Sequence, residues 1–219
     1  MLVYVGADLA PVIQPLTVKI FLEARERNEF SAFDLPERKG VGKITFGVFR
    51  PLNFPGTPVP YHLDVDVTAP LRRVWDTAAN APVDWLRTLF PTLRPEFLVF
   101  SSVQIAPDVA GRRIALAAMV DIINRHLSPG GIVVLNPFPL EYLIRNSPRY
   151  HATPEEKQRG VAALKRHYGR IGLQTIETEP DLMVLQRPAT PIQTSRPEIR
   201  LSRDRFRSMP DVYAYDGLY

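Results

Sequence analysis

Proline is the residue that most constrains what this chain can fold into, because its 219 residues contain 22 prolines and only 12 glycines. A proline has no backbone N–H to donate, and its ring clashes with the preceding turn of a helix. The prolines therefore predict many extended segments and turns, separated by helices of limited length. With 45% hydrophobic residues, the chain can still bury a substantial core in one domain.

The chain contains no cysteine, which excludes disulfides, thiolate metal sites and a cysteine nucleophile and is compatible with a reducing compartment. Its formal charge of +4 favours acidic partners, either a nucleic acid or a small polyanion such as a nucleotide cofactor. Residues 1–10 lack the pattern of a secretory signal, and no stretch approaches the length of a membrane span. We therefore expect a cytoplasmic protein with no membrane association.

Up to about Pro95 the pattern is strand-like and often interrupted by proline. Strands are expected at residues 3–5, 17–24, 43–49 and 62–68. Residues 40–43 superficially match a phosphate-binding loop, but the Ser or Thr that such a loop needs after its lysine is absent. Their glycines are therefore taken to predict a turn. A helical stretch is expected between Pro70 and Phe90, with a break near residues 80–82.

After Pro95 the expected elements alternate more clearly: strand, helix, strand, helix, strand, strand. Their expected ranges are 97–105, 112–127, 132–135, a helix starting after Thr153, 173–177 and 182–186, with a tight turn at 179–181 between the last two. Thr153 suits the helix N-cap, Pro154 the first helical position and Glu156 the capping box. Gly172 suits the left-handed conformation that ends the helix.

The last segment, residues 188–219, mixes prolines with arginines and loses apolar periodicity. Such a composition is typical of an extension that is either disordered or docked on a surface.

Two segments resemble the GNAT superfamily of N-acetyltransferases. Residues 103–116 read VQIAPDVAGRRIAL, which is similar to the strand, Gly-rich turn and helix that bind the cofactor in that superfamily. Residues 167–173 read HYGRIGL, similar to its Tyr-x-x-x-Gly-Phe segment. The resemblance covers residues 97–186 and implies an α/β (α+β) fold, with a central mixed, mostly antiparallel sheet flanked by helices.

The implied organisation is one GNAT-like domain over residues 1–187, followed by the irregular tail. Residues 1–95 form its divergent half and residues 96–187 its cofactor-binding half. The implied activity is transfer of an acyl group, expected to be acetyl, from acetyl-CoA or another acyl-CoA directly to an amine. The acceptor would be a small molecule or a protein, and its identity is not encoded in any motif.

The resemblance implies that the turn entering the helix cradles the cofactor pyrophosphate, since the first N–H groups of a helix are unpaired and its N-terminal end is positive. The preceding strand would splay from its neighbour and pair with the pantetheine arm. The implied cofactor-binding residues are Val103, Ile105, Ala110, Gly111, Arg112, Arg113, Ile114 and Ala115. Ala110 and Arg113 depart from the family pattern, in which an Arg or Gln and a Gly stand, so Arg112 and Arg113 would contact phosphate directly.

The implied general acid is Tyr168, which would protonate the departing thiolate. Glu96, Ser102 and Gln104 are expected on one alternating strand face, and a strand N–H near Gln104 would stabilise the oxyanion. We therefore take Ser102 and Gln104, with Tyr168, as candidate catalytic residues. A general base is not evident on this strand. An alternative source of the base is an expected strand on which three polar residues alternate, His62, Asp64 and Asp66. A solvated strand face is the simpler interpretation of these residues. No metal site is predicted.

Two other functions remain open. Residues 127–134, LSPGGIVV, resemble the turn before a late strand in S-adenosylmethionine-dependent methyltransferases, and residues 3–8, VYVGAD, a degenerate first motif of that fold. A GNAT-fold module without catalysis, binding nucleic acid or protein, would also suit the altered phosphate turn and the basic tail. Nucleic acid is the less favoured partner.

Overall fold

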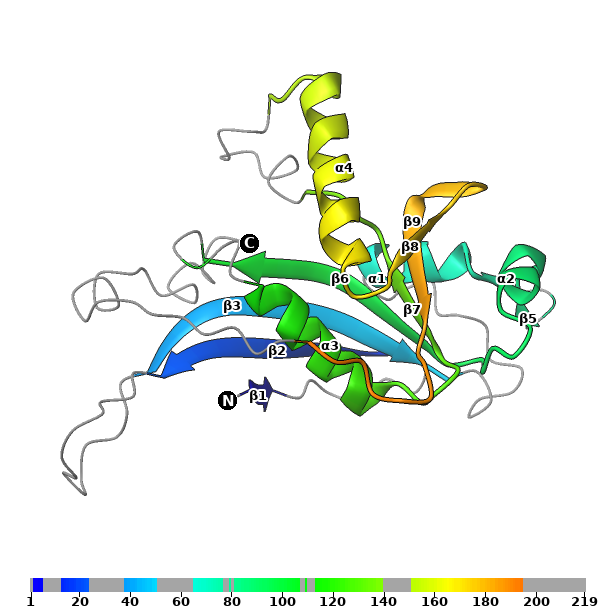
Figure 1. Cartoon of the computed structure of the whole chain (residues 1–219), viewed down its shortest axis with the longest axis horizontal. Helices are drawn as coiled ribbons and strands as arrows, with labels where there is room; N and C mark the ends of the chain where they lie inside the picture. Colours follow the sequence, from blue (N-terminus) through cyan, green and yellow to red (C-terminus); the bar gives the residue numbers. More distant parts are fainter. Residues whose placement is uncertain are drawn as a thin grey trace.

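The computed structural model of the chain describes residues 2–5, 13–23, 38–50, 65–76, 79, 81–106, 109, 113–139 and 151–194. Its centre is a seven-stranded sheet in the order β1-β2-β3-β6-β7-β9-β8 (Figure 1). The strands are β1 (Leu2–Val5), β2 (Ile13–Glu23), β3 (Arg38–Phe49), β6 (Phe97–Ile105), β7 (Ile132–Leu135), β8 (Gln174–Ile176) and β9 (Glu179–Gln186). Only β6 and β7 pair in parallel, so the prediction of a mixed, mostly antiparallel sheet is confirmed.

Helices cover both faces of this sheet. They are α1 (Val65–Arg72), α2 (Asp84–Leu89), α3 (Ile114–His126) and α4 (Pro154–Gly169), and a small hairpin of β4 (Trp75–Asp76) and β5 (Ala81–Pro82) lies between α1 and α2. Alternate residues of the sheet enter two separate apolar clusters, as a pleated strand requires. The first cluster includes α3 and the end of α4, and the second includes α1 and α2. The molecule therefore has three layers, with the sheet in the middle.

Two expectations for the N-terminal half are wrong. Residues 65–68 belong to α1 and not to a strand, whereas 62–64 lie outside the described residues. Leu71 and Val74, at and after the end of α1, are fully buried in the second cluster, so tertiary packing overrides the local strand preference. Residues 40–43 lie within β3. A Cβ at Gly42 would stand 2.7 Å from Ile105 Cδ1, so this glycine permits close strand packing.

The C-terminal half follows the sequence closely. The bounds of β6 and β7 match their expected ranges, and α3 is shorter than expected by two residues at its start and one at its end. At the start of α4, Glu156 N donates to Thr153 Oγ1 (3.3 Å) and Thr153 N donates to Glu156 Oε2 (2.8 Å), which completes the capping box. Gly172 has φ +94° as expected. The turn expected at 179–181 is wrong, because β9 already begins at Glu179.

A buried carboxylate holds together the starts of the two parallel strands. Glu96, only 5% exposed, accepts hydrogen bonds from Arg50 Nε and from the backbone N–H of Ser128 (2.8 Å). Arg50 also donates to the carbonyl of His126 at the end of α3 (2.9 Å). Burial acts to raise the pKa of Glu96, but the hydrogen bonds from Ser128 and Arg50 outweigh it and lower the pKa. Glu96 is therefore an ionised structural group.

The beginning of the C-terminal tail is docked on α3. The side chain of Asn124 accepts from Ile192 N (3.0 Å) and donates to Ile192 O (2.9 Å), as one strand would pair with another. Arg187 Nη2 donates to the carbonyl of Asn124 (3.3 Å), near the negative end of α3. Residues 188–194 are thus held against the domain, and the rest of the tail, 195–219, lies outside the described residues.

Candidate active site at the open edge of β6

A β-bulge in β6 sets the geometry of the candidate site. Phe46 pairs with Phe100, but the next residue of β3, Thr45, pairs with Ser102, which leaves Ser101 as an extra residue. Ser101 Oγ donates to the carbonyl of Thr45 (3.1 Å) and fastens the bulge. A bulge of one residue shifts the alternation of side chains by one position. Side chains after Ser101 therefore face the sheet side opposite to the one expected from strict alternation.

The parallel ladder between β6 and β7 ends at this bulge. Its last pair is Phe100 with Leu135, whereas β6 continues for five more residues to Ile105. Within the part of the chain that the structure describes, no strand pairs with residues 101–105 on the β7 side. Figure 1 shows β6 extending away from the point where the chain leaves β7 toward α4. Among the described residues, this edge of β6 therefore has no strand partner beyond Phe100, and we call it the open edge of β6.

The backbone groups that face this opening can be identified from the ladder with β3. Ala106 N donates to Val41 O (2.8 Å), so the backbone of Ala106 faces β3. Because successive residues of an antiparallel strand turn their N–H and C=O groups to alternate sides, Val103 and Ile105 direct theirs away from β3. These are the two strand residues that the resemblance assigned to the pantetheine arm.

The faces of Ser102 and Gln104 differ from the expectation. Leu98 and Phe100, which share the parity of Glu96, pack in the first cluster, and Val103 and Ile105 pack against it as well. Ser102 and Gln104 pair with Thr45 and Lys43, between the inward-facing Ile44 and Phe46, and so lie on the opposite face with the half-buried Lys43 and Thr45. The expectation that they share a face with Glu96 is wrong. The backbone N–H of Gln104 faces β3, so an N–H available to an oxyanion belongs to Val103 or Ile105.

The open edge leads toward the N-terminus of α3, where Arg113 is the N-cap residue. Arg113 has φ 60° and ψ 13°, the left-handed conformation that favours glycine, and no side-chain hydrogen bond caps this end of α3 among the described residues. Ile114 is buried and Ala115 half-buried in the first turn. Ala110, Gly111 and Arg112 lie outside the described residues. Arg113, which stands where the GNAT pattern has a glycine, thus has a glycine-like backbone conformation.

Replacing Arg113 by glycine is expected to stabilise the protein by about 0.5–1 kcal/mol, because glycine adopts φ 60° without the steric cost that arginine incurs. Urea denaturation measures the difference. The matched control is Arg170→Gly, since Arg170 ends α4 with φ −65° and gains nothing from glycine there. Stabilisation by both substitutions, or by neither, would contradict the interpretation.

Tyr168 lies at the end of α4, buried in the first cluster with 7% of its surface exposed. Burial raises the pKa of Tyr168 to about 12, so its phenol is protonated at neutral pH. That state is required of a proton donor, although so high a pKa makes the phenol a weak acid. Because Tyr168 belongs to the first cluster, it lies on the α3 and α4 side of the sheet, opposite to the side chains of Ser102 and Gln104.

Next to Tyr168, His167 was not identified as a candidate from the sequence. Its ring centroid is 5.4 Å from that of Tyr168 in an edge-on arrangement, and burial, assisted by Arg170, lowers the pKa of His167. A neutral imidazole at pH 7 can accept a proton. Of the three base candidates from the N-terminal half, Asp66 lies in α1, and His62 and Asp64 lie outside the described residues.

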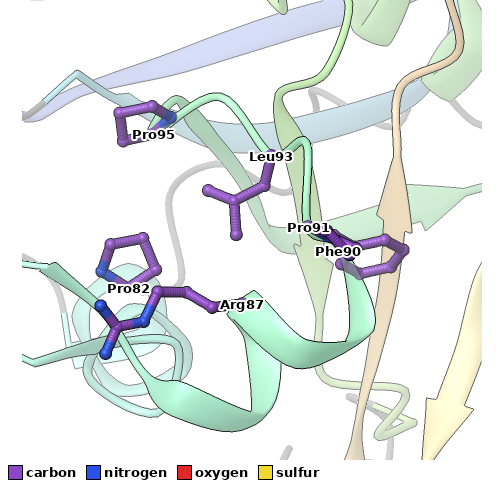
Figure 2. Close-up of a pocket in the computed structure, with 6 residues that line it drawn as sticks. All are labelled: Pro82, Arg87, Phe90, Pro91, Leu93 and Pro95. Atoms are coloured by element: carbon purple, nitrogen blue, oxygen red, sulfur yellow. The ribbon is translucent and has the colours of Figure 1, made fainter.

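A shallow pocket of about 260 Å³ lies elsewhere, around α2 (Figure 2). It is lined by Pro82, Arg87, Phe90, Pro91, Leu93 and Pro95. Figure 2 shows Leu93 pointing into the space bounded by Pro82 and Arg87. Arg87 forms an exposed ion pair with Asp84, and none of the predicted site residues lines the pocket. The pocket is therefore separate from the open edge of β6.

In the described ranges, no helix is long and apolar enough to cross a membrane, and no group of three or more His, Asp or Glu residues could hold a metal ion. No protein-family model, curated protein or solved structure matches the chain. The function is therefore inferred from the open edge of β6 and the helix that follows it.

Proposed function

We propose that this protein is an acyl-CoA-dependent N-acyltransferase of the GNAT type, most simply an acetyltransferase. The observation that carries the proposal is the open edge of β6, where Val103 and Ile105 turn backbone donors and acceptors away from β3 beyond the last pair with β7. A second feature supports it: the same strand leads to a helix N-terminus that no described side chain caps. An extended amide arm joined to a phosphate group has the shape and the hydrogen-bonding groups to fit both.

The acyl-CoA substrate would lie along β6 with its two pantetheine amides pairing as an added strand would. Its pyrophosphate would meet the N–H groups of Ile114 and Ala115, where the helix dipole favours negative charge. Arg113 adds a cation at this end of α3. If the backbone does most of the binding, Arg113→Gly retains the affinity for acetyl-CoA, whereas a role for the guanidinium predicts that the affinity falls.

In the proposed reaction an uncharged amine of the acceptor attacks the thioester carbonyl, and a C–N bond forms while the carbonyl oxygen becomes an oxyanion. The N–H of Val103 or Ile105 stabilises that charge. Collapse of the intermediate breaks the C–S bond, and the thiolate takes a proton to leave as the free thiol of CoA. The proton lost by the amine goes to a base, for which His167 is the candidate, or to water.

Replacing Tyr168 by phenylalanine tests the proton donor. If the phenol protonates the thiolate, kcat for acetyl transfer falls about 10²-fold while KM changes little. Steady-state kinetics over a panel of amines supplies the measurement. A kcat equal to that of the wild type would remove Tyr168 from the mechanism and leave it as a core residue of the first cluster.

The methyltransferase alternative has less support. Ser128 and Gly130 lie where β7 begins, and their backbones are engaged by Glu96, Arg94 and Arg187. In open α/β sheets ligands bind at the opposite, carboxyl ends of the strands. Moreover β1, which would carry the degenerate first motif, is an antiparallel strand at the edge of the sheet.

Isothermal titration with acetyl-CoA and with S-adenosylmethionine separates the two enzymes. We expect heat of binding with acetyl-CoA and none with S-adenosylmethionine. Heat with S-adenosylmethionine and none with acetyl-CoA would overturn the proposal. A non-catalytic module predicts instead that neither cofactor binds while a DNA or RNA probe shifts in a gel.

A further inference from the structure

Asn136 lies at the point where β6 and β7 separate. The last pair of their parallel ladder is Phe100 with Leu135, and the residues that follow are Ser101, the extra residue of the bulge, and Asn136. In open α/β sheets, ligands bind at the carboxyl ends of the strands. Asn136 stands at that end of β7. It therefore marks the inner end of the open edge of β6, although it was not identified as a candidate from the sequence.

Pro137 explains why β7 ends here. Phe138 N donates to the carbonyl of Asn136 (2.9 Å), which is the hydrogen bond of a γ-turn centred on Pro137. The inverse form of this turn has a central φ of about −75°, close to the value of about −65° that proline imposes. The buried Pro137 also has no N–H to donate to β6. Asn136 and Pro137 thus turn the chain out of the ladder, and among the described residues 101–105 have no strand partner on this side.

The side chain of Asn136 is available to a ligand. Asn136 is exposed, and among the described residues its carboxamide has no hydrogen-bond partner, whereas its carbonyl is used in the turn. A carboxamide offers two N–H donors and one acceptor oxygen. Because Leu135 packs in the first cluster, alternation along β7 assigns Asn136 to the other side of the sheet, the side of α1 and α2. An uncharged donor is thus placed beside the inner end of the open edge.

The binding mode proposed above brings the thioester to this residue. The pyrophosphate of acyl-CoA meets the start of α3, beyond the end of β6, and the pantetheine arm runs back along Ile105 and Val103. The thioester is at the far end of that arm from the pyrophosphate. It therefore reaches the inner end of the open edge, where the N–H of Val103 and the carboxamide of Asn136 are placed.

We propose that Asn136 is a catalytic residue whose Nδ2 donates a hydrogen bond to the carbonyl oxygen of the thioester. The backbone N–H of Val103 supplies the other donor, and the two together form an oxyanion hole. This inference rests on the proposed acyltransferase function. A side-chain amide suits the role because it stabilises developing negative charge while remaining uncharged itself.

The carbonyl oxygen changes its charge during the reaction, and Asn136 acts on that change. As the amine attacks, a C–N bond forms and the π electrons of the carbonyl move onto its oxygen, where both donors stabilise the charge. The carbonyl then re-forms, the C–S bond breaks, and its electron pair leaves with the sulfur, which Tyr168 protonates. The substituents of the tetrahedral carbon point in different directions. The oxygen can therefore face Asn136 on one side of the sheet while the sulfur faces Tyr168 on the other.

The test compares Asn136→Ala and Asn136→Asp with a matched control, Gln174→Ala, which removes an exposed carboxamide from β8. Acetyl transfer from acetyl-CoA to a panel of amines gives kcat and KM, and isothermal titration gives the affinity for acetyl-CoA. We expect Asn136→Ala to lower kcat about 10²-fold and to change KM and affinity little. Asn136→Asp has nearly the shape of the wild type but lacks the donor and adds a negative charge, so its kcat should fall at least as far. Gln174→Ala should match the wild type.

The outcomes separate this inference from the proposed function. A kcat of Asn136→Ala equal to that of the wild type, in a protein that binds acetyl-CoA and transfers acetyl, would reject the role of Asn136 and retain the acyltransferase. An affinity for acetyl-CoA that falls as far as kcat would also overturn the inference, because Asn136 would then act in binding alone. A wild type that neither binds acetyl-CoA nor acetylates an amine of the panel would reject both. If circular dichroism shows that Asn136→Ala is unfolded, Asn136→Asp decides by the same criteria.

Discussion

Val103→Pro is expected to lower the affinity for acetyl-CoA about tenfold or more while leaving the protein folded. The N–H of Val103 faces the open edge, so proline removes a donor that the cosubstrate needs and β3 does not use. Proline is tolerated in a strand where its nitrogen faces away from the ladder, and its side chain is close to valine in size. Isothermal titration measures the affinity, and circular dichroism the fold.

Gln104→Pro is the matched control, one residue further along the same strand. The N–H of Gln104 faces β3, so proline there removes a ladder hydrogen bond and is expected to destabilise the protein by about 3 kcal/mol. The pair of variants thus separates a role in binding from a role in folding. Equal destabilisation by both would show that the two backbones are equivalent and that β6 has no open edge.

Glu96→Ala is expected to lower the free energy of unfolding by about 2–3 kcal/mol. The substitution leaves the N–H of the half-buried Ser128 without its acceptor and Arg50 without its carboxylate. The half-exposed position of Arg50 keeps the cost below that of a fully buried pair. Urea denaturation at pH 7 gives the value. Asp84→Ala, which breaks an exposed ion pair in α2, serves as control and should change stability little.

The same carboxylate predicts a dependence on pH. Because the pKa of Glu96 is lower in the folded protein, its ionised form contributes stability that is present above the ordinary carboxylate pKa of 4.5 and is lost as the pH falls through the lowered value. The advantage of the wild type over Glu96→Gln should therefore be constant near neutral pH and shrink below about pH 4.5. An advantage that grows on acidification would have the wrong sign.

Elements with strong local signals could be predicted from the sequence. The capping box of Thr153 and Glu156 marks the start of α4, and the continuous apolar run of residues 132–135 marks β7, because both depend on neighbours in the chain. The first half of α1 could not, since residues 65–68 pattern as the end of a strand, and the burial of Leu71 and Val74 in the second cluster favours the helix. The place of Gly42 within a strand could not be predicted either, because the glycine is required by close packing between strands that only the three-dimensional structure shows.

The helix and strand of the candidate site could be predicted from the sequence, but the directions of its side chains could not. The strand and helix around Val103 and Ile114 follow from local pattern, but the faces of Ser102 and Gln104 depend on one extra residue in β6. The consecutive serines 101 and 102, between the apolar run of residues 97–100 and the alternating residues 103–105, were a signal for that bulge. The pairing of Ser102 and Gln104 with Thr45 and Lys43 was missed because these residues belong to strands distant in sequence.

The order of strands in the sheet has a consequence for synthesis. The last of the described strands to be made, β9, lies between β7 and β8 and pairs with both. A nascent chain can therefore form the β1-β2-β3 meander early, but β8 has no partner in the sheet until residues 179–186 leave the ribosome. Until then the exposed edge of β7 is a template for pairing with other chains. Slow or interrupted translation near the C-terminus should therefore favour aggregation more than the same interruption after β3.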